Sequence, residues 1–505
     1  MLVLAFAGLV PATAAAISFQ DGVASGDVTS TRAILWARAD TAENYKVEIF
    51  DNAALHPPKV FQGKMKTDAS RDYTLKIDAS GLQPNTQYWF RFKKDLDTGG
   101  TVLSDVGTFK TAPASNTAAN VKLGYTGDSD TTLLNGVPAF NDFKTLQALQ
   151  NDNTDAWIYL GDTIYSDSSF RPTGPATTLA EYRQAYHDGR TYANLRNLLE
   201  STSTYPLMDD HEVVNDYTAA TVDPARYAAG RKAFLENMPI RETGLLHDPS
   251  CAGDPLYRKY SWGSSVDLFV LDERSCRSAE SVAACQNDLA PTLPPAARQV
   301  FPFNLFLTPN PPPGCLAALN NPSRTLLGPV QKAQFKQDLL NSTAQYKLIV
   351  NEDPIQQFFV LPYDRWEGYG ADRSEILNFI RNNGIDNTLF LTTDTHATLQ
   401  NHVAVDRFTD PSTISDEMVT GPIATNTFQA EVLGVAGPVG LFAVNTALNA
   451  FTGIQCRNLN QNSYATVDVT AGGTATITSK TDTGVPVTGV NTSGGSLPCT
   501  GTYGP

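Results

Sequence analysis

The chain has 505 residues, of which 41% are hydrophobic and 18% are charged, so it can bury a large core and form two or three domains. Its formal net charge of −15 and its pI of about 4.8 argue against nucleic acid as a structural partner and against an anionic membrane surface. A small anionic substrate is still compatible with this charge, provided that metal ions and a few arginines dominate the local field.

The N-terminus predicts export from the cytoplasm. Residues 1–17 combine an apolar run with small residues suited to cleavage, as in a secretory signal peptide; a buried first strand is the alternative. An even number of cysteines in a secreted chain favours disulfides. We expect Cys456 to pair with Cys499, with other connectivities open. The remaining cysteines are Cys251, Cys276, Cys285 and Cys315.

Residues 18–112 predict an all-β domain. Short alternating segments at 33–40, 45–50, 73–78 and 87–93 are typical of strands, and Trp36 is a candidate core residue. Leu82, Pro84 and Tyr88 have the spacing of a tyrosine corner, which is found in fibronectin-like and immunoglobulin-like β-sandwiches. We therefore predict a fibronectin-like β-sandwich, followed by a linker at 111–120.

Residues 118–483 alternate between strand and helix patterns, which predicts an α/β layered domain. Helical spacing marks 140–150, 179–199, 331–340 and 373–383. A cysteine- and proline-rich segment at about 248–325 predicts a disulfide-stapled surface insertion, and two late strands predict a hairpin. We expect 484–505 to be a surface tail. The apolar stretch 432–444 is short and broken by glycine and proline, so we predict a packed loop and no transmembrane segment.

Several apolar strands end in carboxylates, and this pattern indicates a metal centre. Asp128, Asp162, Asp210, Asp272 and Asp394 each come at or just after such a run. The carboxyl ends of strands form ligand sites in open α/β sheets, and gathered carboxylates repel one another unless a cation is present.

The residues around these aspartates suit metal ligation. Tyr165 lies three residues after Asp162 and can reach the same cavity, where a phenolate would bind Fe(III) well; a core tyrosine is the alternative. Asp394 and His396 share one face of an extended segment. A carboxylate with an imidazole suits zinc, iron or manganese, whereas oxygen ligands alone suit calcium, magnesium or manganese.

Two further motifs offer catalytic side chains. The segment 209–216 contains a possible ligand, Asp210 or Asn215, and a possible proton donor, His211; a helix-capping loop is the alternative. Arg274 and Arg277 present planar guanidinium groups suited to phosphate oxygens, and surface ion pairs are the alternative.

These motifs, taken together, resemble the alkaline phosphatase D (PhoD-like) branch of the metallophosphatases. The match covers most of the chain and is carried by FQDGVASGD (19–27), GDTIY (161–165), DDHEVVND (209–216), LDERSCR (271–277), YDRWEGY (363–369) and DTH (394–396). The resemblance implies a core of two mixed β-sheets flanked by helices, behind an N-terminal β-sandwich.

The resemblance to this family and to purple acid phosphatases also implies a metal centre with two or more ions. It implies that Asp162 bridges the metals, and that Asp128, Tyr165 and His396 hold the first, Fe(III). Asp394, with Asp210 or Asn215, would hold a second divalent metal, Ca, Zn or Mn. Many family members carry a cysteine in the first strand-end motif, where this chain has Tyr-Thr-Gly-Asp at 125–128, so no thiolate–iron bond is expected. Glu352 is a possible further ligand.

The expected function is hydrolysis of phosphomonoesters by a secreted, monomeric enzyme. A metal-activated hydroxide would attack phosphorus, His211 would protonate the leaving group, and Arg274, with Arg277, would bind the phosphate. Two alternatives remain. One is a phosphodiesterase, acting for example on phospholipid headgroups; the other is a secreted binding protein on a phosphatase scaffold that has lost its activity.

Overall fold

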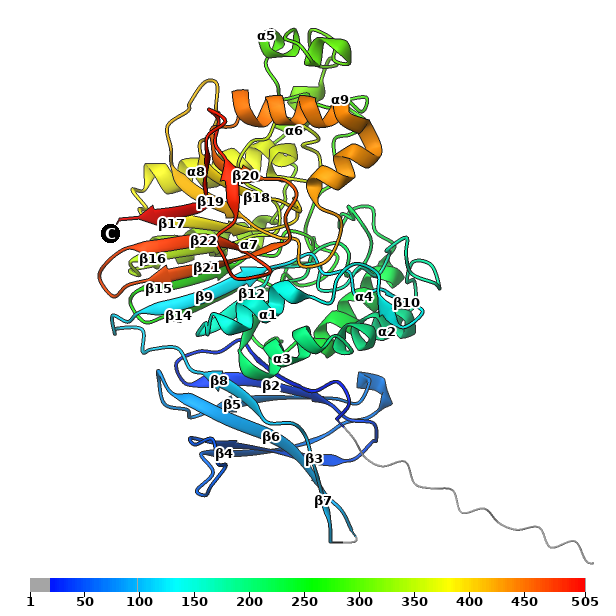
Figure 1. Cartoon of the computed structure of the whole chain (residues 1–505), viewed down its shortest axis with the longest axis vertical. Coiled ribbons are helices and arrows are strands. Elements are labelled where there is room, and N and C mark those ends of the chain that lie inside the picture. Colours follow the sequence, from blue (N-terminus) through cyan, green and yellow to red (C-terminus); the bar gives the residue numbers. More distant parts are fainter. Residues whose placement is uncertain (1–18, 98, 505) are drawn as a thin grey trace, which may run out of the picture.

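A computed structural model describes residues 19–97 and 99–504 of the chain; the predicted signal peptide, 1–17, lies outside them. Two mixed sheets of nine strands each form the centre of the molecule, and helices cover their outer faces. The N-terminal strands lie at one end, and α5 and α9 lie at the other (Figure 1). The prediction of two mixed sheets flanked by helices is therefore confirmed.

The first sheet joins strands from the N-terminal region, the middle and the C-terminus of the chain. Its parallel centre, β9-β12-β13, continues through β1 into the antiparallel pair β2-β5, and through β21 into β22 and β25. In sheet order the strands are β25 (Thr500–Tyr503), β22 (Ala475–Thr481), β21 (Ser463–Val469), β9 (Val121–Thr126), β12 (Ala156–Tyr159), β13 (Thr204–Pro206), β1 (Val23–Gly26), β2 (Arg32–Arg38) and β5 (Thr74–Ser80).

The second sheet has a parallel centre, β15-β16-β17-β19, with antiparallel strands on both sides. In sheet order its strands are β14 (Arg258–Trp262), β15 (Val266–Val270), β16 (Tyr346–Val350), β17 (Thr388–Thr392), β19 (Ser415–Val419), β18 (Thr398–Val403), β20 (Ile454–Asn458), β23 (Thr488–Val490) and β24 (Ser496–Pro498). The parallel strands of each sheet end beside the same region, and the candidate site lies there.

The N-terminal region also contains a third, antiparallel sheet. Its strands are β4 (Phe61–Lys66), β3 (Asn44–Phe50), β6 (Gln87–Asp95), β7 (Thr101–Leu103) and β8 (Gly107–Lys110). Val47 and Phe90 of this sheet belong to the same buried cluster as Leu35 of β2. The Tyr88 hydroxyl accepts a hydrogen bond from the Gln83 backbone N–H at 2.8 Å, as the tyrosine-corner pattern predicts. The fibronectin-like identity of this region stays a prediction.

Successive side chains along each central strand point to opposite faces of the sheet, and this divides the core into layers. Ile158 and Leu268 pack in the cluster between the sheets, whereas Trp157 faces the helices outside the first sheet and Phe269 faces those outside the second. The helices are α1 (Lys144–Asn151), α2 (Leu179–Arg190), α3 (Ala193–Ser201), α4 (Pro224–Asn237), α5 (Pro295–Arg298), α6 (Cys315–Leu319), α7 (Pro329–Asn341), α8 (Gly370–Asn382) and α9 (Phe428–Ala450). Short elements complete the fold: η1 (Ala69–Arg71), η2 (Phe303–Leu305), η3 (Trp366–Tyr369), β10 (Leu133–Leu134) and β11 (Val137–Pro138).

All six cysteines form disulfides, with the connectivity Cys251–Cys276, Cys285–Cys315 and Cys456–Cys499. The predicted pair Cys456–Cys499 is confirmed, and the other two disulfides lie in the middle segment. That segment is not wholly a surface insertion, because β14 and β15 within it pair in the second sheet. The parts before β14 and after β15 lie outside the sheet.

Two other predictions about the C-terminal part are wrong. Residues 432–444 are not a packed loop, because they lie in α9, whose length and hydropathy would suffice to cross a membrane. The surface tail predicted at 484–505 is wrong for its described part, because β23 and β24 extend the second sheet and β25 pairs with β22 in the first. Glycine-rich composition concealed these strands, because glycine is depleted in strands, and β23 and β25 also pair with the more distant β20 and β22.

Candidate metal centre

Four predicted ligands follow central strands and have unusual backbone conformations. Asp128 follows β9, Asp162 follows β12, and Asp394 and His396 follow β17. Their φ angles are 63°, 47°, 62° and 53° respectively, a left-handed region in which side chains other than glycine are strained. Gly161 precedes Asp162 with φ of 69°, and a Cβ there would lie 2.7 Å from Asp209 Cβ. Strain concentrated at several strand ends is typical of a functional site.

The first group of ligand atoms joins both sheets. The carboxylates of Asp128 and Asp162 and a ring nitrogen of His396 place one atom each within 4.8 Å of one another. The Tyr165 hydroxyl lies 2.9 Å from His396 Nε2. Asp128 Oδ2 is buried and has no hydrogen-bond partner, and such a group is costly unless something binds it. These donors fit a hard metal ion.

A second group shares Asp162 with the first. Ligand atoms of Asp162, Asp210 and His211 lie within 4.8 Å of one another, so Asp162 occupies the position between two groups that a bridging ligand requires. Asn215 also lines the cavity at this site. Its side chain is exposed, and its backbone N–H donates to Asp167 Oδ2 at 2.6 Å.

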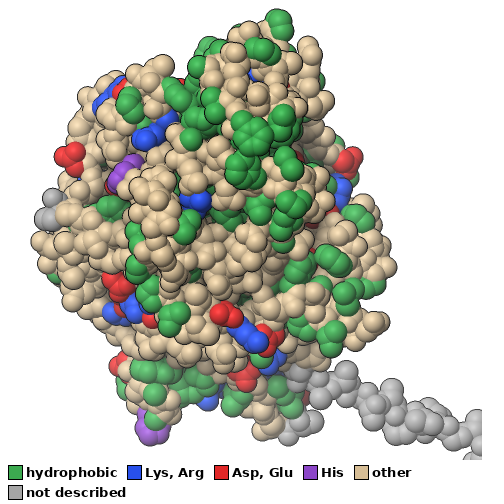
Figure 2. Space-filling model, turned by 45° about the horizontal axis from the view of Figure 1, so that its top comes forward, with side chains coloured by type: hydrophobic (Ala, Val, Ile, Leu, Met, Phe, Trp, Pro, Cys, Tyr) green, Lys and Arg blue, Asp and Glu red, His purple; other side chains and the backbone are tan. Residues whose placement is uncertain are grey.

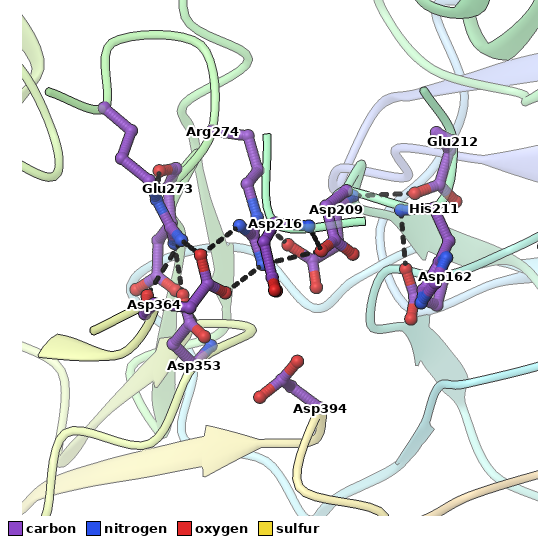
Figure 3. A network of polar contacts seen from close by, with 12 residues as sticks. Asp162, Asp209, His211, Glu212, Asp216, Glu273, Arg274, Asp353, Asp364 and Asp394 are labelled. Atoms are coloured by element: carbon purple, nitrogen blue, oxygen red, sulfur yellow. Dashed lines mark hydrogen bonds and ion pairs between the residues drawn. The ribbon is translucent and has the colours of Figure 1, made fainter. Parts of the chain in front are cut away.

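Asp394 lies at the edge of these groups. Its backbone N–H donates to Asp128 Oδ1 at 3.2 Å, whereas its carboxylate lies within 4.8 Å of carboxylate oxygens of Asp353 and Asp364. Figure 3 shows this carboxylate on the side of the site near Asp353, away from Asp162. The structure therefore connects Asp394 to the first group through its backbone and to a third acidic group through its side chain.

The cavity above these residues has a volume of about 420 Å³. Its described lining contains no lysine or arginine. The lining residues are Asp130, Phe140, Asp162, Tyr165, Asp167, Ser168, Ser169, Phe170, Asp210, His211, Asn215, Asp216, Asp394, His396, Thr425, Asn426 and Glu431. A larger cavity of about 630 Å³ lies beside α4, but its described lining has no histidine and none of the predicted ligands. The smaller cavity is thus the candidate site.

Burial and mutual repulsion shape the titration of this cluster. Burial raises the pKa of Asp128 to about 6. Burial and the charge of Asp210 raise the pKa of Asp162 well above its ordinary value, and burial together with Asp162 does the same for the Tyr165 phenol. Glu352 is also buried, and neither of its carboxylate oxygens has a hydrogen-bond partner. The protein itself supplies little positive charge to balance the ionised forms of these groups, and bound cations would allow them to ionise.

His211 is held in place by two contacts. Its Nδ1 lies 2.5 Å from Asp167 Oδ1, and its ring stacks on Tyr165 with centroids 4.0 Å apart. Burial alone would lower the pKa of His211, but Asp210 and Asp167 raise it to about 9. These carboxylates favour the protonated imidazole, and His211 lines the cavity, as a proton donor requires.

Two carboxylates that sequence analysis missed orient the histidines. Asp167 binds His211, and Glu431, in the first turn of α9, lies 2.7 Å from His396 Nδ1. The second contact leaves His396 Nε2 directed at the first group, an arrangement typical of metal-binding histidines. Asp167 lies only two residues after the predicted ligand Tyr165, and this spacing indicates that it could reach the same site. Glu431 is 35 residues from His396, and no sequence pattern indicates their contact.

The structure does not place Arg274 and Arg277 where we predicted. Both are buried, and neither lines the cavity. Arg274 binds Asp364 through two hydrogen bonds of 2.8 Å and also contacts Asp209. Arg277 contacts Asp353 and Asp364. Figure 3 shows Arg274 enclosed by these aspartates. Their guanidinium donors bind protein carboxylates instead of facing a substrate.

Comparison with known proteins agrees with this geometry. A family model described as PhoD-like phosphatase matches residues 135–477, and one described as PhoD-like phosphatase, N-terminal domain matches residues 5–113. The chain is 28% identical to alkaline phosphatase D of Bacillus subtilis (strain 168) over 431 residues, which cover 77% of this chain and 66% of that protein. The match thus spans just under two thirds of the relative's length.

Two solved structures share the fold. A structure of PhoD superposes with a TM-score of 0.73 and 23% identity, covering 96% of this chain and 90% of the other. A purple acid phosphatase from yellow lupin (Lupinus luteus) seeds gives a TM-score of 0.56 at 10% identity, covering 95% and 73%. At these identities the likeness concerns the fold.

Proposed function

The chain belongs to the PhoD-like phosphatase family, and from this premise we propose that it is a metal-dependent hydrolase of phosphomonoesters. One observation carries the proposal: the described lining of the cavity is rich in carboxylates and contains no lysine or arginine. A phosphate ester is repelled by such a cavity, so bound cations must supply the positive charge. The buried, unpartnered Asp128 Oδ2 supports the same requirement.

The donors suggest how two metals would be held. We propose Fe(III) at Asp128, Asp162, Tyr165 and His396, because phenolate and carboxylate oxygens suit a hard trivalent ion. A second, divalent ion (Ca, Zn or Mn) would take Asp162 and Asp210, with Asn215 and Asp394 as further candidates. When bound, such ions neutralise phosphate charge and lower the pKa of water.

The protein's own groups would position the substrate and move the proton. His211 donates a proton to the leaving oxygen, and Asp167 holds its Nδ1 so that the other ring nitrogen faces the cavity. Arg274 acts as a positioning residue, because it fixes Asp209 and lies 3.5 Å from Asp210 Oδ2. Phe140 and Phe170 line the cavity with ring centroids 5.4 Å apart and offer an apolar contact for the organic part of the ester.

One observation favours phosphodiesters as a second candidate. A monoester carries two negative charges near neutral pH and a diester carries one, and the described lining offers no lysine or arginine to balance the second charge. Turnover of 4-nitrophenyl phosphate and of its bis-ester, on protein loaded with iron and calcium, separates these activities. We expect the monoester to have the higher kcat/KM; the reverse order would favour the diester.

The same experiment tests the third reading, a secreted binding protein without activity. We expect chelation to abolish turnover and the metals to restore it. Absence of turnover of both esters at full metal occupancy would support the binding protein. His211→Asn sharpens the test: its loss should be about 100-fold or more for phenyl phosphate, a poor leaving group, and smaller for 4-nitrophenyl phosphate. Equal losses would reject His211 as the proton donor.

We also propose that the protein is secreted and monomeric. Three disulfides support export, because they persist mainly in oxidising compartments. Titration of the denatured, unreduced protein should find no reactive thiol, and several reactive cysteines would contradict export. Light scattering should give the mass of one chain, and a larger mass would contradict the monomer.

A further inference from the structure

An exposed hydrophobic surface lies at the end of the molecule formed by α9 and the loop around η2. We call it the apolar cap. It consists of Val300, Phe301, Leu305, Phe306, Leu433, Val435, Val439 and Phe442. Val435 is 92% exposed, Leu305 61% and Phe301 60%, and the rings of Phe301 and Phe442 lie 5.8 Å apart. Figure 2 shows hydrophobic side chains gathered at this end. Large exposed apolar surfaces of this kind mark interaction sites.

The apolar cap is also uncharged, which narrows the choice of partner. Residues 299–314 and 432–450 contain no Asp, Glu, Lys, Arg or His, although the whole chain carries a net charge of −15. An anionic membrane would repel the protein, whereas the hydrocarbon boundary of a zwitterionic bilayer matches a neutral apolar surface. A specific protein partner would ordinarily be met by a polar rim with charges that fix its orientation.

The shape of α9 indicates that it would lie on a membrane instead of crossing it. Its apolar window has a mean hydropathy of 1.4 and is only 28% buried. However, Gly437 has non-helical angles (φ 62°, ψ −167°) and Pro438 follows it. Figure 1 shows the helix bent into two arms. At a rise of about 1.5 Å per residue, each arm is much shorter than a hydrocarbon core of about 30 Å.

The apolar cap is connected to the catalytic cavity. Glu431, in the first turn of α9, lines the cavity and binds His396 Nδ1, and Leu433 and Val435 follow within the same helical arm. A membrane that contacted the helix would therefore lie beside the opening that admits substrate. We propose that the apolar cap docks the protein on the surface of a zwitterionic lipid bilayer, with α9 lying in the plane of the interface.

Vesicle flotation tests the docking without reference to catalysis. Full-length protein is expected to float with large phosphatidylcholine vesicles. Val439→Asp should lower the bound fraction by about tenfold or more, because burial of one valine side chain is worth about that factor in partitioning. Val485→Asp is the matched control: both valines are 55% exposed, but Val485 lies in the turn after β22. Equal melting temperatures of the two variants show that the fold is intact.

A second variant tests the docking through a fluorescence change that appears on binding, so the test does not depend on a loss of binding alone. A tryptophan in Phe442→Trp should shift its emission to the blue when phosphatidylcholine vesicles are added, and lipids brominated on their chains should quench it. Binding of both valine variants like the wild type, or an unshifted emission, would overturn the proposal. So would a dimer in light scattering that Val439→Asp dissociates, because the occupant would then be a second copy of the chain.

Discussion

Two acidic clusters lie side by side in this molecule and are neutralised in different ways. The open cluster is formed by Asp162, Tyr165, Asp210 and His396, which line the cavity, and by Asp128, which is grouped with Asp162 and His396. The arginine-paired cluster, formed by Asp209, Asp353, Asp364, Arg274 and Arg277, lies beside it (Figure 3). Apart from the contact of Arg274 with Asp210, the first cluster depends on cations from outside the chain, whereas the second is neutralised by its own arginines. Two clusters with the same number of carboxylates can therefore differ in how much they need bound metal ions to balance their charge.

The pKa values of individual groups express this difference. Burial would raise the pKa of Asp364, but Arg274 and Arg277 hold it well below its usual range. Asp162 has no such neighbour, and burial with Asp210 raises its pKa. The two clusters do not differ at every residue. Burial raises the pKa of Asp209 and Asp353 to about 7 even though both lie beside the arginines. The third acidic group, at Asp394, joins the two clusters.

The largest effect is expected from removing the carboxylate shared by two ligand groups. Asp162→Ala should lose both metals and reduce turnover by more than about 100-fold, the upper range for changes in the second coordination sphere alone. Elemental analysis of the purified variant measures this. Asp130→Ala is the control and should retain metal, because Asp130 lines the same cavity but belongs to none of the candidate ligand groups among the described residues. Full metal content in Asp162→Ala would show that Asp162 is not the bridge.

A mutation in the arginine-paired cluster should lower the stability of the fold and leave the metal content unchanged. Arg277→Met leaves Asp353 and Asp364 short of their buried cation, which should lower the free energy of unfolding by about 3–5 kcal/mol. Urea denaturation measures the loss. Arg381→Met is the control: its ion pair with Asp410 is more than a third exposed on both sides and should cost at most about 1 kcal/mol. Similar losses in both variants would remove the distinction between the clusters.

A spectroscopic effect should identify the metal of the open cluster. If Tyr165 phenolate binds Fe(III), the iron-loaded protein absorbs visible light by charge transfer, and Tyr165→Phe should remove the band while keeping the ring stacked on His211. Tyr159→Phe is the control, because this buried tyrosine hydrogen-bonds to Ser129 and lies outside the proposed ligand set. A band unchanged by Tyr165→Phe would show that Tyr165 is only a core residue.

The sequence predicted the elements whose signal is local. Apolar runs ending in Asp128, Asp162 and Asp394 indicated the site because parallel strands bring their carboxyl ends together. What it missed depends on contacts between distant segments. Glu431 reaches His396 only because α9 starts beside the end of β17, and Arg274 looks the same in sequence whether it binds phosphate or Asp364. The helix α9 was missed because Gly437 and Pro438 break its pattern, although each arm remains helical.

The smallest effect is expected at a carboxylate outside both clusters, Glu200 of α3. Burial and the charge of Asp105 raise the pKa of Glu200 from its ordinary value of 4.5 to about 7. An acid with a raised pKa keeps its proton longer in the folded state, so stability should fall as pH rises from about 4.5 to 7 and stay reduced above that. Because the side chain is only half-buried, the loss should be roughly 1–2 kcal/mol. Glu200→Gln should remove it.

Urea denaturation at pH 5 and pH 8 separates this effect from those at the two clusters. Glu200→Gln should be more stable than the wild type at pH 8 and nearly equal to it at pH 5, and its metal content should not change. Asp105→Asn keeps the acid but removes the neighbouring charge, so it should recover part of the same stability. A gain of equal size at both pH values would show that packing, and not ionisation, is responsible. A carboxylate can thus be buried and perturbed without being a ligand, and metal content distinguishes the open cluster from Glu200.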